Sequence, residues 1–159
     1  MAVADPLENQ QTAIPYREPV AGTVYETRLK GAPLDPPADL DTLPKNFLYQ
    51  VRKLNDKIAM RKKRYGLWQE YTWQQVYEHV TDFAMGLVSL GLSAGEAVCI
   101  IGENDPEMYW AQMAAHAMHV KTTCIFSDAT PRDIIYAVTS AGGTFLVAHD
   151  QEQVDKALE

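Results

Sequence analysis

Positive charge is scarce in this sequence. Its 14 lysines and arginines stand against 21 aspartates and glutamates, which gives 159 residues a net charge of −7. Proteins that bind nucleic acid without sequence preference draw most of their affinity from basic side chains that neutralise phosphates. The composition therefore argues against a nucleic-acid partner.

The one basic run is Arg61-Lys62-Lys63-Arg64. It could contact anionic lipid headgroups or a phosphate-bearing ligand. Four charges fall short of the clusters typical of such sites, so the run is interpreted as the solvated end of a hairpin.

Cysteine is also scarce, and both cysteines, Cys99 and Cys124, lie within apolar runs that are typical of strands. We expect two buried free thiols, because the pair has neither the spacing of a metal site nor the pattern of a secreted disulfide framework. A reducing, cytoplasmic location is the simplest inference. A disulfide between the two remains the alternative.

No long apolar run is present. The stretch from Met108 to Val120 is broken by Gln112, His116 and His119, whereas a spanning helix needs about 20 mostly apolar residues. Near the start, acidic residues and the lack of an apolar block argue against a signal or transit peptide. We expect no transmembrane segment.

The phosphate-binding loops of nucleotide-binding proteins are absent. The sequence contains no G-x-x-x-x-G-K-[ST] motif, and no G-x-G-x-x-G follows a strand. Gly102 alone cannot hold a pyrophosphate. Gly142-Gly143 ends a predicted helix, so the helix dipole there has the wrong sign for a phosphate.

Proline is concentrated at the start, where residues 1–44 hold seven of the nine prolines. Proline fixes its own backbone and disfavours helix in the residue before it. We therefore divide the chain into a proline-rich extended arm at 1–42 and an α/β domain at 43–159.

The first half of that domain predicts two helices and a hairpin. Leu43, Phe47, Val51 and Leu54 recur at helical spacing over 43–56. Two strands, 57–63 and 67–72, flank the turn Arg64-Tyr65-Gly66. A helix over 73–90 begins at a Thr72–Gln75 capping box.

The second half alternates short apolar strands with helices. We expect strands at 97–102, 120–126 and 144–149, and helices at 106–118, 131–141 and 151–158. This order is typical of an α/β fold with a mostly parallel sheet and helices on both faces. The arm and the small hairpin precede this sheet.

Polar side chains follow two of the expected parallel strands. Asn104-Asp105-Pro106-Glu107 and Ser127-Asp128-Ala129-Thr130-Pro131 lie where open α/β sheets bind ligands. Both segments also have the chemistry of a helix start, with Asn104 or Asp105 capping one helix and Thr130 or Asp128 the other. Capping is the favoured interpretation of both.

Histidine supplies no convincing site. His116 and His119 are three residues apart and could share a metal, but no nearby Cys, Asp or Glu completes a tetrahedral set. His79 and His149 stand alone. We therefore assign no catalytic, cofactor-binding or metal-binding residue in this chain.

The order of several short motifs nevertheless resembles the AMP-forming acyl-CoA synthetases, long-chain fatty-acid ligases of bacterial type above all. The resemblance covers about three-quarters of the chain and implies that its fold is the incomplete N-terminal subdomain of a larger one. It is carried by Trp68-Gln69-Glu70-Tyr71-Thr72-Trp73, Gly86 to Gly91, Gly95-Glu96-Ala97-Val98, Asn104-x-Pro106-Glu107, Thr130-Pro131 and Ala148 to Lys156. Asp105 and Met108 depart from the family pattern, which commonly has Arg and Trp there.

The resemblance implies a complete enzyme that activates a fatty acid with Mg-ATP to an acyl-adenylate and passes the acyl group to CoA. The family's phosphate-contacting loop, ribose-binding Asp and catalytic Lys have no counterpart in these 159 residues. We thus expect this chain alone to be inactive and to hold no cofactor. Its expected partners are the remainder of a ligase chain or a second copy, with peripheral membrane contact.

Two other functions stay open. The chain could be a freestanding, non-enzymatic α/β interaction module that pairs through its unfinished sheet edge. It could also be a small nucleotide-binding protein with only a superficial likeness to the ligases, although the missing phosphate loops disfavour that alternative.

Overall fold

The structure is a computed structural model that describes residues 37 and 39–159. Most of the arm predicted at 1–42 therefore lies outside the described residues. Thr42–Glu159 form one compact unit, which contains the helices and strands of the described chain.

The predicted order of elements is confirmed, with boundaries that differ by one or two residues. The elements are α1 (Leu43–Leu54), β1 (Ile58–Arg64), β2 (Leu67–Thr72), α2 (Trp73–Ser89), β3 (Ala97–Gly102), α3 (Pro106–Ala117), β4 (Lys121–Phe126), α4 (Pro131–Ala141), β5 (Phe145–Ala148) and α5 (Gln151–Leu158).

Helix α1 ends two residues earlier than predicted. Thr42 caps its start by accepting from the Lys45 amide at 3.4 Å, and Pro44 lies in the first turn. At the other end Asn55 adopts a positive φ of 33° while its amide donates to the Val51 carbonyl. This left-handed residue closes the helix before Asp56.

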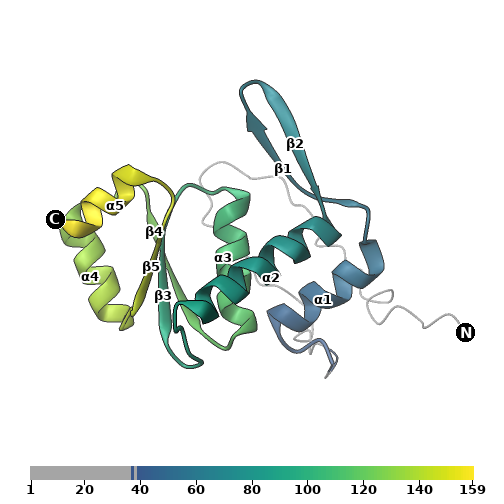
Figure 1. Cartoon of the computed structure of the whole chain (residues 1–159), viewed down its shortest axis with the longest axis horizontal. Helices are drawn as coiled ribbons and strands as arrows, with labels where there is room; N and C mark the ends of the chain where they lie inside the picture. The colour runs from purple at the N-terminus through teal and green to yellow at the C-terminus, as the bar shows by residue number, and fades with distance from the viewer. Residues whose placement is uncertain (1–36, 38) are drawn as a thin grey trace, which may run out of the picture. The chain divides into compact units, whose positions relative to one another are not determined.

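The hairpin of β1 and β2 closes through two residues only. Arg64 pairs with Leu67, so Arg64 belongs to the strand and not to the turn. Tyr65 and Gly66 form the turn with φ values of 50° and 82°. Positive φ at both central residues is the signature of a type I′ turn, which suits the twist of a hairpin. The turn stands clear of the helices in Figure 1.

Helix α2 begins as the sequence predicts. Thr72 Oγ1 accepts from the Gln75 amide at 3.2 Å, and Gln75 Oε1 accepts from the Thr72 amide at 2.9 Å, so the capping box is formed. The predicted helix is one residue too long. Leu90 lies beyond the last helical residue and is 70% exposed.

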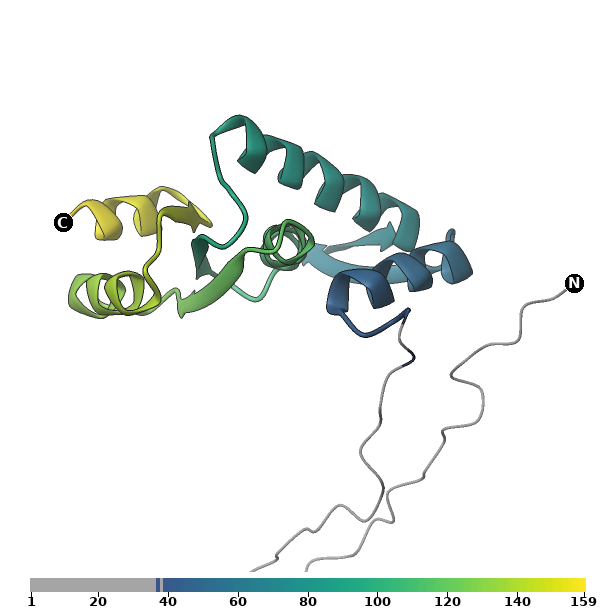
Figure 2. The ribbon, with the colours of Figure 1, turned by 90° about the horizontal axis from the view of Figure 1, so that it is seen from below.

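Strands β3, β4 and β5 form a three-stranded parallel sheet in the described chain, in the order β4-β3-β5. Ile100 pairs with Cys124 on one side and with Val147 on the other. Figures 1 and 2 show α2 and α3 on one side of this sheet and α4 and α5 on the other. The predicted α/β architecture is therefore confirmed.

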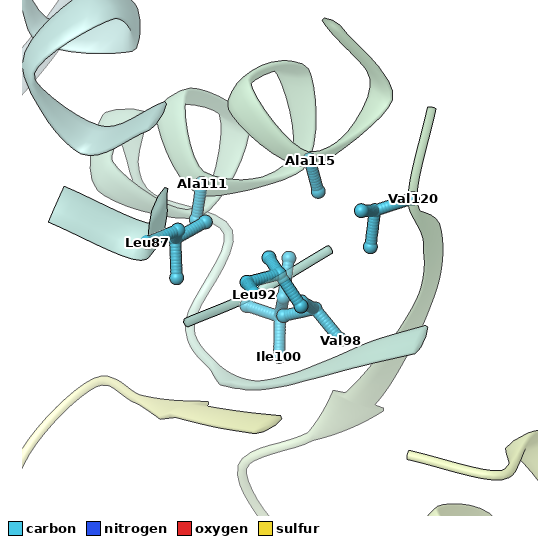
Figure 3. Close-up of a cluster of buried hydrophobic side chains, with 7 residues drawn as sticks. All are labelled: Leu87, Leu92, Val98, Ile100, Ala111, Ala115 and Val120. Carbon is cyan, nitrogen blue, oxygen red and sulfur yellow. The ribbon is translucent and has the colours of Figure 1, made fainter. Parts of the chain in front are cut away.

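Alternate side chains of β3 supply the two halves of the core. Val98 and Ile100 point toward α2 and α3, where they meet small residues that let the helix lie close to the sheet. Figure 3 shows this cluster, which comprises Leu87, Leu92, Val98, Ile100, Ala111, Ala115 and Val120.

The opposite face of β3 carries Cys99 and Ile101, which pack with Ile125 and Ile134 under α4. Packing is closest at Gly143, where an added Cβ would lie 2.6 Å from Cys99 Sγ. Each face of the strand thus has its own helical cover. This explains why β3 is a continuous apolar run and not an alternating one.

Helix α4 begins at a second capping box. The Asp133 amide donates to Thr130 Oγ1 at 3.3 Å, while the Thr130 hydroxyl donates to Asp133 Oδ2 at 2.7 Å. The hydrogen bonds from the side chain and backbone of Thr130 lower the pKa of Asp133. Thr130 is thus the cap, one of the two residues that the sequence offered.

The expectation of two buried thiols is wrong for one of them. Cys99 is buried and Cys124 is exposed, and both thiols are free. Cys124 lies opposite Ile100, but β4 is an edge strand and its face is only partly covered. Burial raises the pKa of the Cys99 thiol, with a smaller contribution from the neighbouring Cys124, and partial desolvation by the residues around it raises the pKa of the Cys124 thiol.

Candidate functional site

Charged side chains from three separate segments meet at the carboxyl end of the parallel sheet. Asp105, which follows β3, lies at the N-cap position of α3 but makes no capping hydrogen bond through its side chain. Its Oδ2 instead accepts from Lys62 Nζ of the hairpin and lies 3.2 Å from His149 Nε2. Asp105 therefore occupies the N-cap position, but its carboxylate does not cap the helix, and that part of the prediction is wrong.

A second ion pair joins the same two elements. Arg64 donates to Glu107 Oε1 at 2.6 Å, and Lys62 Nζ lies 3.7 Å from Glu107 Oε2. We call Lys62, Arg64, Asp105, Glu107 and His149 the carboxyl-edge cluster. The cluster fixes the hairpin against the first turn of α3.

The basic run is therefore not simply the solvated end of a hairpin. The side chain of Lys62 is only 15% exposed and that of Asp105 only 19%. Arg61, in contrast, pairs with Glu70 across the hairpin, and both side chains are about half exposed. Because successive strand residues face opposite sides, one half of the run contacts α3 and the other half faces solvent.

The expectation that His149 stands alone is wrong. His149 follows β5, and its Nδ1 lies 3.5 Å from Asp150 Oδ2. The absence of a side chain at Gly102 makes room for it, since a Cβ there would lie 2.4 Å from the His149 Cβ. Gly102 is thus needed for close approach and not for binding a phosphate.

A cavity of about 270 Å³ opens beside the carboxyl-edge cluster. Its floor is apolar and comes from Phe83, Ile100, Met108 and Val147, and its rim includes Arg64, Glu103, Glu107 and His149. Its volume lies just below the range of about 300–1,000 Å³ usual for small-molecule sites. The arrangement suits a small apolar group that is held beneath a polar edge.

The loop after β4 is tied to the same edge. Ser127 Oγ donates to Glu103 at 2.8 Å, and Lys156 of α5 donates to the Ser127 carbonyl at 2.9 Å. Asn104 accepts from the Tyr109 hydroxyl at 2.6 Å. These contacts engage Asn104 and Ser127, two of the polar residues that follow the strands.

The cluster does not fit magnesium or ATP. Oxygen ligands of Mg²⁺ must be free to face the ion, whereas Asp105 and Glu107 already face Lys62 and Arg64. The same pairing occupies the cations that would otherwise meet a triphosphate. Within the part of the chain that the structure describes, no group of three His, Cys, Asp or Glu side chains is arranged to hold a metal.

The remaining histidines lie at structural positions away from the carboxyl-edge cluster. His116 Nε2 lies 2.9 Å from Thr122 Oγ1, which joins α3 to β4. His119 follows the helix with a positive φ of 61°. His79 stacks on Trp110 with a ring separation of 4.0 Å.

Across the described residues, no helix is both long and apolar enough to cross a bilayer. The candidate site is thus a small cavity at the carboxyl end of a parallel sheet, the position at which open α/β folds bind ligands. Its side chains can bind and orient a ligand. They are paired with one another in a way that leaves no activated nucleophile in the cluster.

The fold is an α/β domain with an open parallel sheet in its described residues. The chain belongs to the AMP-binding enzyme family, whose model matches residues 47–159. The resemblance found in the short motifs is thereby confirmed at the level of the family.

Curated relatives are long-chain-fatty-acid–CoA ligases. ACSBG1 of Bos taurus is 27% identical over 118 residues, which make up 74% of this chain and 16% of the relative. ACSBG2 of Xenopus laevis is 25% identical over 127 residues, or 77% of this chain and 17% of the relative. The chain spans about one-sixth of the length of these relatives.

Solved structures support the fold. The N-terminal subdomain of NpsA from Klebsiella oxytoca matches with a TM-score of 0.63 at 22% identity, over 69% of this chain and 28% of that one. O-succinylbenzoate coenzyme A synthetase from Bacillus subtilis, in complex with AMP, matches with a TM-score of 0.60 at 17% identity, over 69% and 29% of the two chains.

Proposed function

We propose that this chain is the N-terminal segment of a long-chain fatty-acyl-CoA synthetase. The complete enzyme would activate a fatty acid with ATP and magnesium to an acyl-adenylate, release pyrophosphate and transfer the acyl group to CoA. The observation that carries this proposal is the match of three-quarters of the chain to enzymes named as long-chain-fatty-acid–CoA ligases.

Within such an enzyme this segment would act as a scaffold. The cavity beside the carboxyl-edge cluster has an apolar floor, which suits a wall of a substrate passage better than a phosphate site. Its paired charges would hold the hairpin and α3 in place while residues from the rest of the enzyme carry out the chemistry. The protein would be cytoplasmic, in peripheral contact with the membrane that holds its fatty substrate.

The 159-residue chain alone would be inactive. Phosphoryl and adenylyl transfer depend on positioned cations and hydrogen-bond donors around the phosphates. In the described chain, the cations of the carboxyl-edge cluster face carboxylates instead. Nothing in the cluster is therefore placed to stabilise a leaving pyrophosphate.

The test is exchange of labelled pyrophosphate into ATP, measured with and without palmitate. We expect no exchange by the purified chain and fatty-acid-dependent exchange by the longer protein that an antibody to residues 1–159 isolates from the native source. Exchange by the short chain would refute its inactivity. A longer protein that shows no exchange would refute the ligase proposal.

A freestanding interaction module is the second candidate. Strands β4 and β5 each pair with β3 only, so the described sheet has two open edges, and open edges favour pairing with another chain. A native mass of 17.8 kDa together with reversible dimerisation in sedimentation equilibrium would favour this module. A much larger native mass would favour the ligase.

A further inference from the structure

The closed end of the β1–β2 hairpin presents three large side chains to solvent. Tyr65 is 104% exposed, Leu67 is 74% exposed and Trp68 is 64% exposed. They are consecutive except for Gly66, and Figure 1 shows this end of the hairpin away from the helices. Side chains of this size at such a position contribute little to the stability of the domain.

The turn itself would fold better with another residue. Tyr65 has a φ of 50°, a region that bulky side chains rarely adopt and that Asn or Gly accepts readily. Asn-Gly is the preferred pair in a two-residue turn of this type. Retaining a strained tyrosine at the tip therefore calls for an explanation other than folding.

A cation lies beside the aromatic residues. Lys63 pairs with Trp68 across the hairpin, so their side chains share a face. Lys63 is exposed, and no ion pair or hydrogen bond engages its side chain among the described residues. Its positive charge stands out on a chain whose net charge is −7.

We propose that the hairpin tip, defined as Lys63, Tyr65, Leu67 and Trp68, docks on an anionic lipid surface. Trp and Tyr favour the headgroup level of a bilayer because their rings are apolar with one polar edge. Leu67 would enter the acyl boundary, and Lys63 would face the lipid phosphates. This rests on the peripheral membrane contact proposed above and specifies the residues that make it.

The tip fits a lipid surface better than a protein groove. It is a convex end of only a few side chains, whereas a specific protein interface buries about 800 Å² on each partner. A bilayer accepts a small wedge without a matching shape. The pairing of aromatic rings with an unpaired lysine supplies the complementarity that an anionic surface requires.

The 159-residue chain can be tested by flotation with vesicles of phosphatidylcholine, either alone or mixed with phosphatidylserine. We expect binding to the mixed vesicles only, with weaker binding as salt is raised. Lys63→Ala should lower the partition coefficient about fivefold, as the loss of one cation near the surface implies. Trp68→Ser should lower it at least as much.

Tyr65→Asn is the sharpest variant, because asparagine suits the turn. It should keep or raise the thermal unfolding midpoint while lowering vesicle binding, which separates docking from misfolding. Tyr136→Asn is the matched control. Tyr136 is 74% exposed on α4, and its replacement should leave binding unchanged.

Three results would overturn the proposal: equal binding to neutral and anionic vesicles, no binding to either, or an equal loss from Tyr136→Asn. A change in self-association without any change in vesicle binding would identify a second copy as the occupant instead. None of these readouts requires catalysis, so their failure leaves the ligase proposal to the exchange assay.

Discussion

Strand β3 and the β1–β2 hairpin are held in place by different forces. Five of the six residues of β3 are buried, and the strand is covered by helices on both faces. None of the residues of β1 or β2 is buried. The hairpin packs only the partly buried Ala59, Met60 and Tyr71 against α2 and α3, and ion pairs also fix it to the first turn of α3. The hydrophobic effect has no preferred direction and no single partner, whereas these ion pairs require particular partners.

This difference predicts which substitutions will reduce the stability of the domain. The sheet should lose stability in proportion to the apolar atoms removed, wherever along β3 they are removed. The hairpin should respond only at the positions that contact α2 or α3 or close the turn, and the rest of its surface should be free to serve another role.

The largest effect is expected for Ile101→Ala. Ile101 is 1% exposed between β4 and α4, and truncation of such a residue costs about 2–5 kcal/mol. Leu67→Ala on the exposed hairpin should change the free energy of unfolding by less than about 0.5 kcal/mol. Urea titration followed by circular dichroism compares the two. Similar losses would remove the proposed distinction between the regions.

The next largest loss of stability is expected when a methyl group is added to Gly102, at the carboxyl end of β3. Gly102→Ala places a Cβ within 2.4 Å of the His149 Cβ, and overpacking of this kind costs about 1–3 kcal/mol. Gly86→Ala is the control, because no atom lies within 4 Å of its added Cβ and its helical position favours alanine. Thermal unfolding should show a loss for the first and a gain for the second.

A smaller effect should follow removal of the hairpin contact. Lys62→Ala leaves Asp105 without its cation in a half-buried place, so its cost should fall between the ~0.2–1 kcal/mol of exposed pairs and the ~3–5 kcal/mol of buried ones. Hydrogen exchange should speed up in β1 and β2 and stay unchanged in β3. Arg61→Ala, which breaks only the exposed pair with Glu70, should show almost no change.

The two cysteines should differ most clearly in their accessibility to reagents. Their effect on stability should be the smallest of those considered. A maleimide should modify exposed Cys124 in the folded protein and reach buried Cys99 only after unfolding. Because desolvation raises both pKa values, the thiolate fraction is small near neutral pH. Labelling of Cys124 should therefore keep accelerating as the pH passes about 8.5, where labelling of an unperturbed thiol begins to level off. In Cys124→Ser, rapid labelling of the native state would contradict the burial of Cys99.

Local chemistry accounts for what could be predicted along the chain. The capping box at Thr72, the cap expected at Thr130 or Asp128 and the continuous apolar run of β3 are short-range signals. The structure confirms the first and the third and shows Thr130 as the cap. The misplaced end of α1 has a local cause as well. Asn55 tolerates a left-handed backbone, and periodicity alone does not reveal that.

The carboxyl-edge cluster was not predictable in the same way. Lys62 and Asp105 are 43 residues apart, and nothing in either segment specifies the other as its partner. The acidic residues after β3 looked like helix caps, and the basic run looked like a solvated turn. Only the packing of the hairpin against α3 makes them an ion-pair network.

The sequence by itself determined the order of helices and strands, the two-faced burial of β3 and the family to which the chain belongs. These follow from side-chain period, capping chemistry and short motifs, which act over a few residues. Tertiary structure decided which charges pair, which cysteine is covered and where the cavity opens. Those features depend on distances between segments far apart in the chain, and such distances are fixed only when the elements pack.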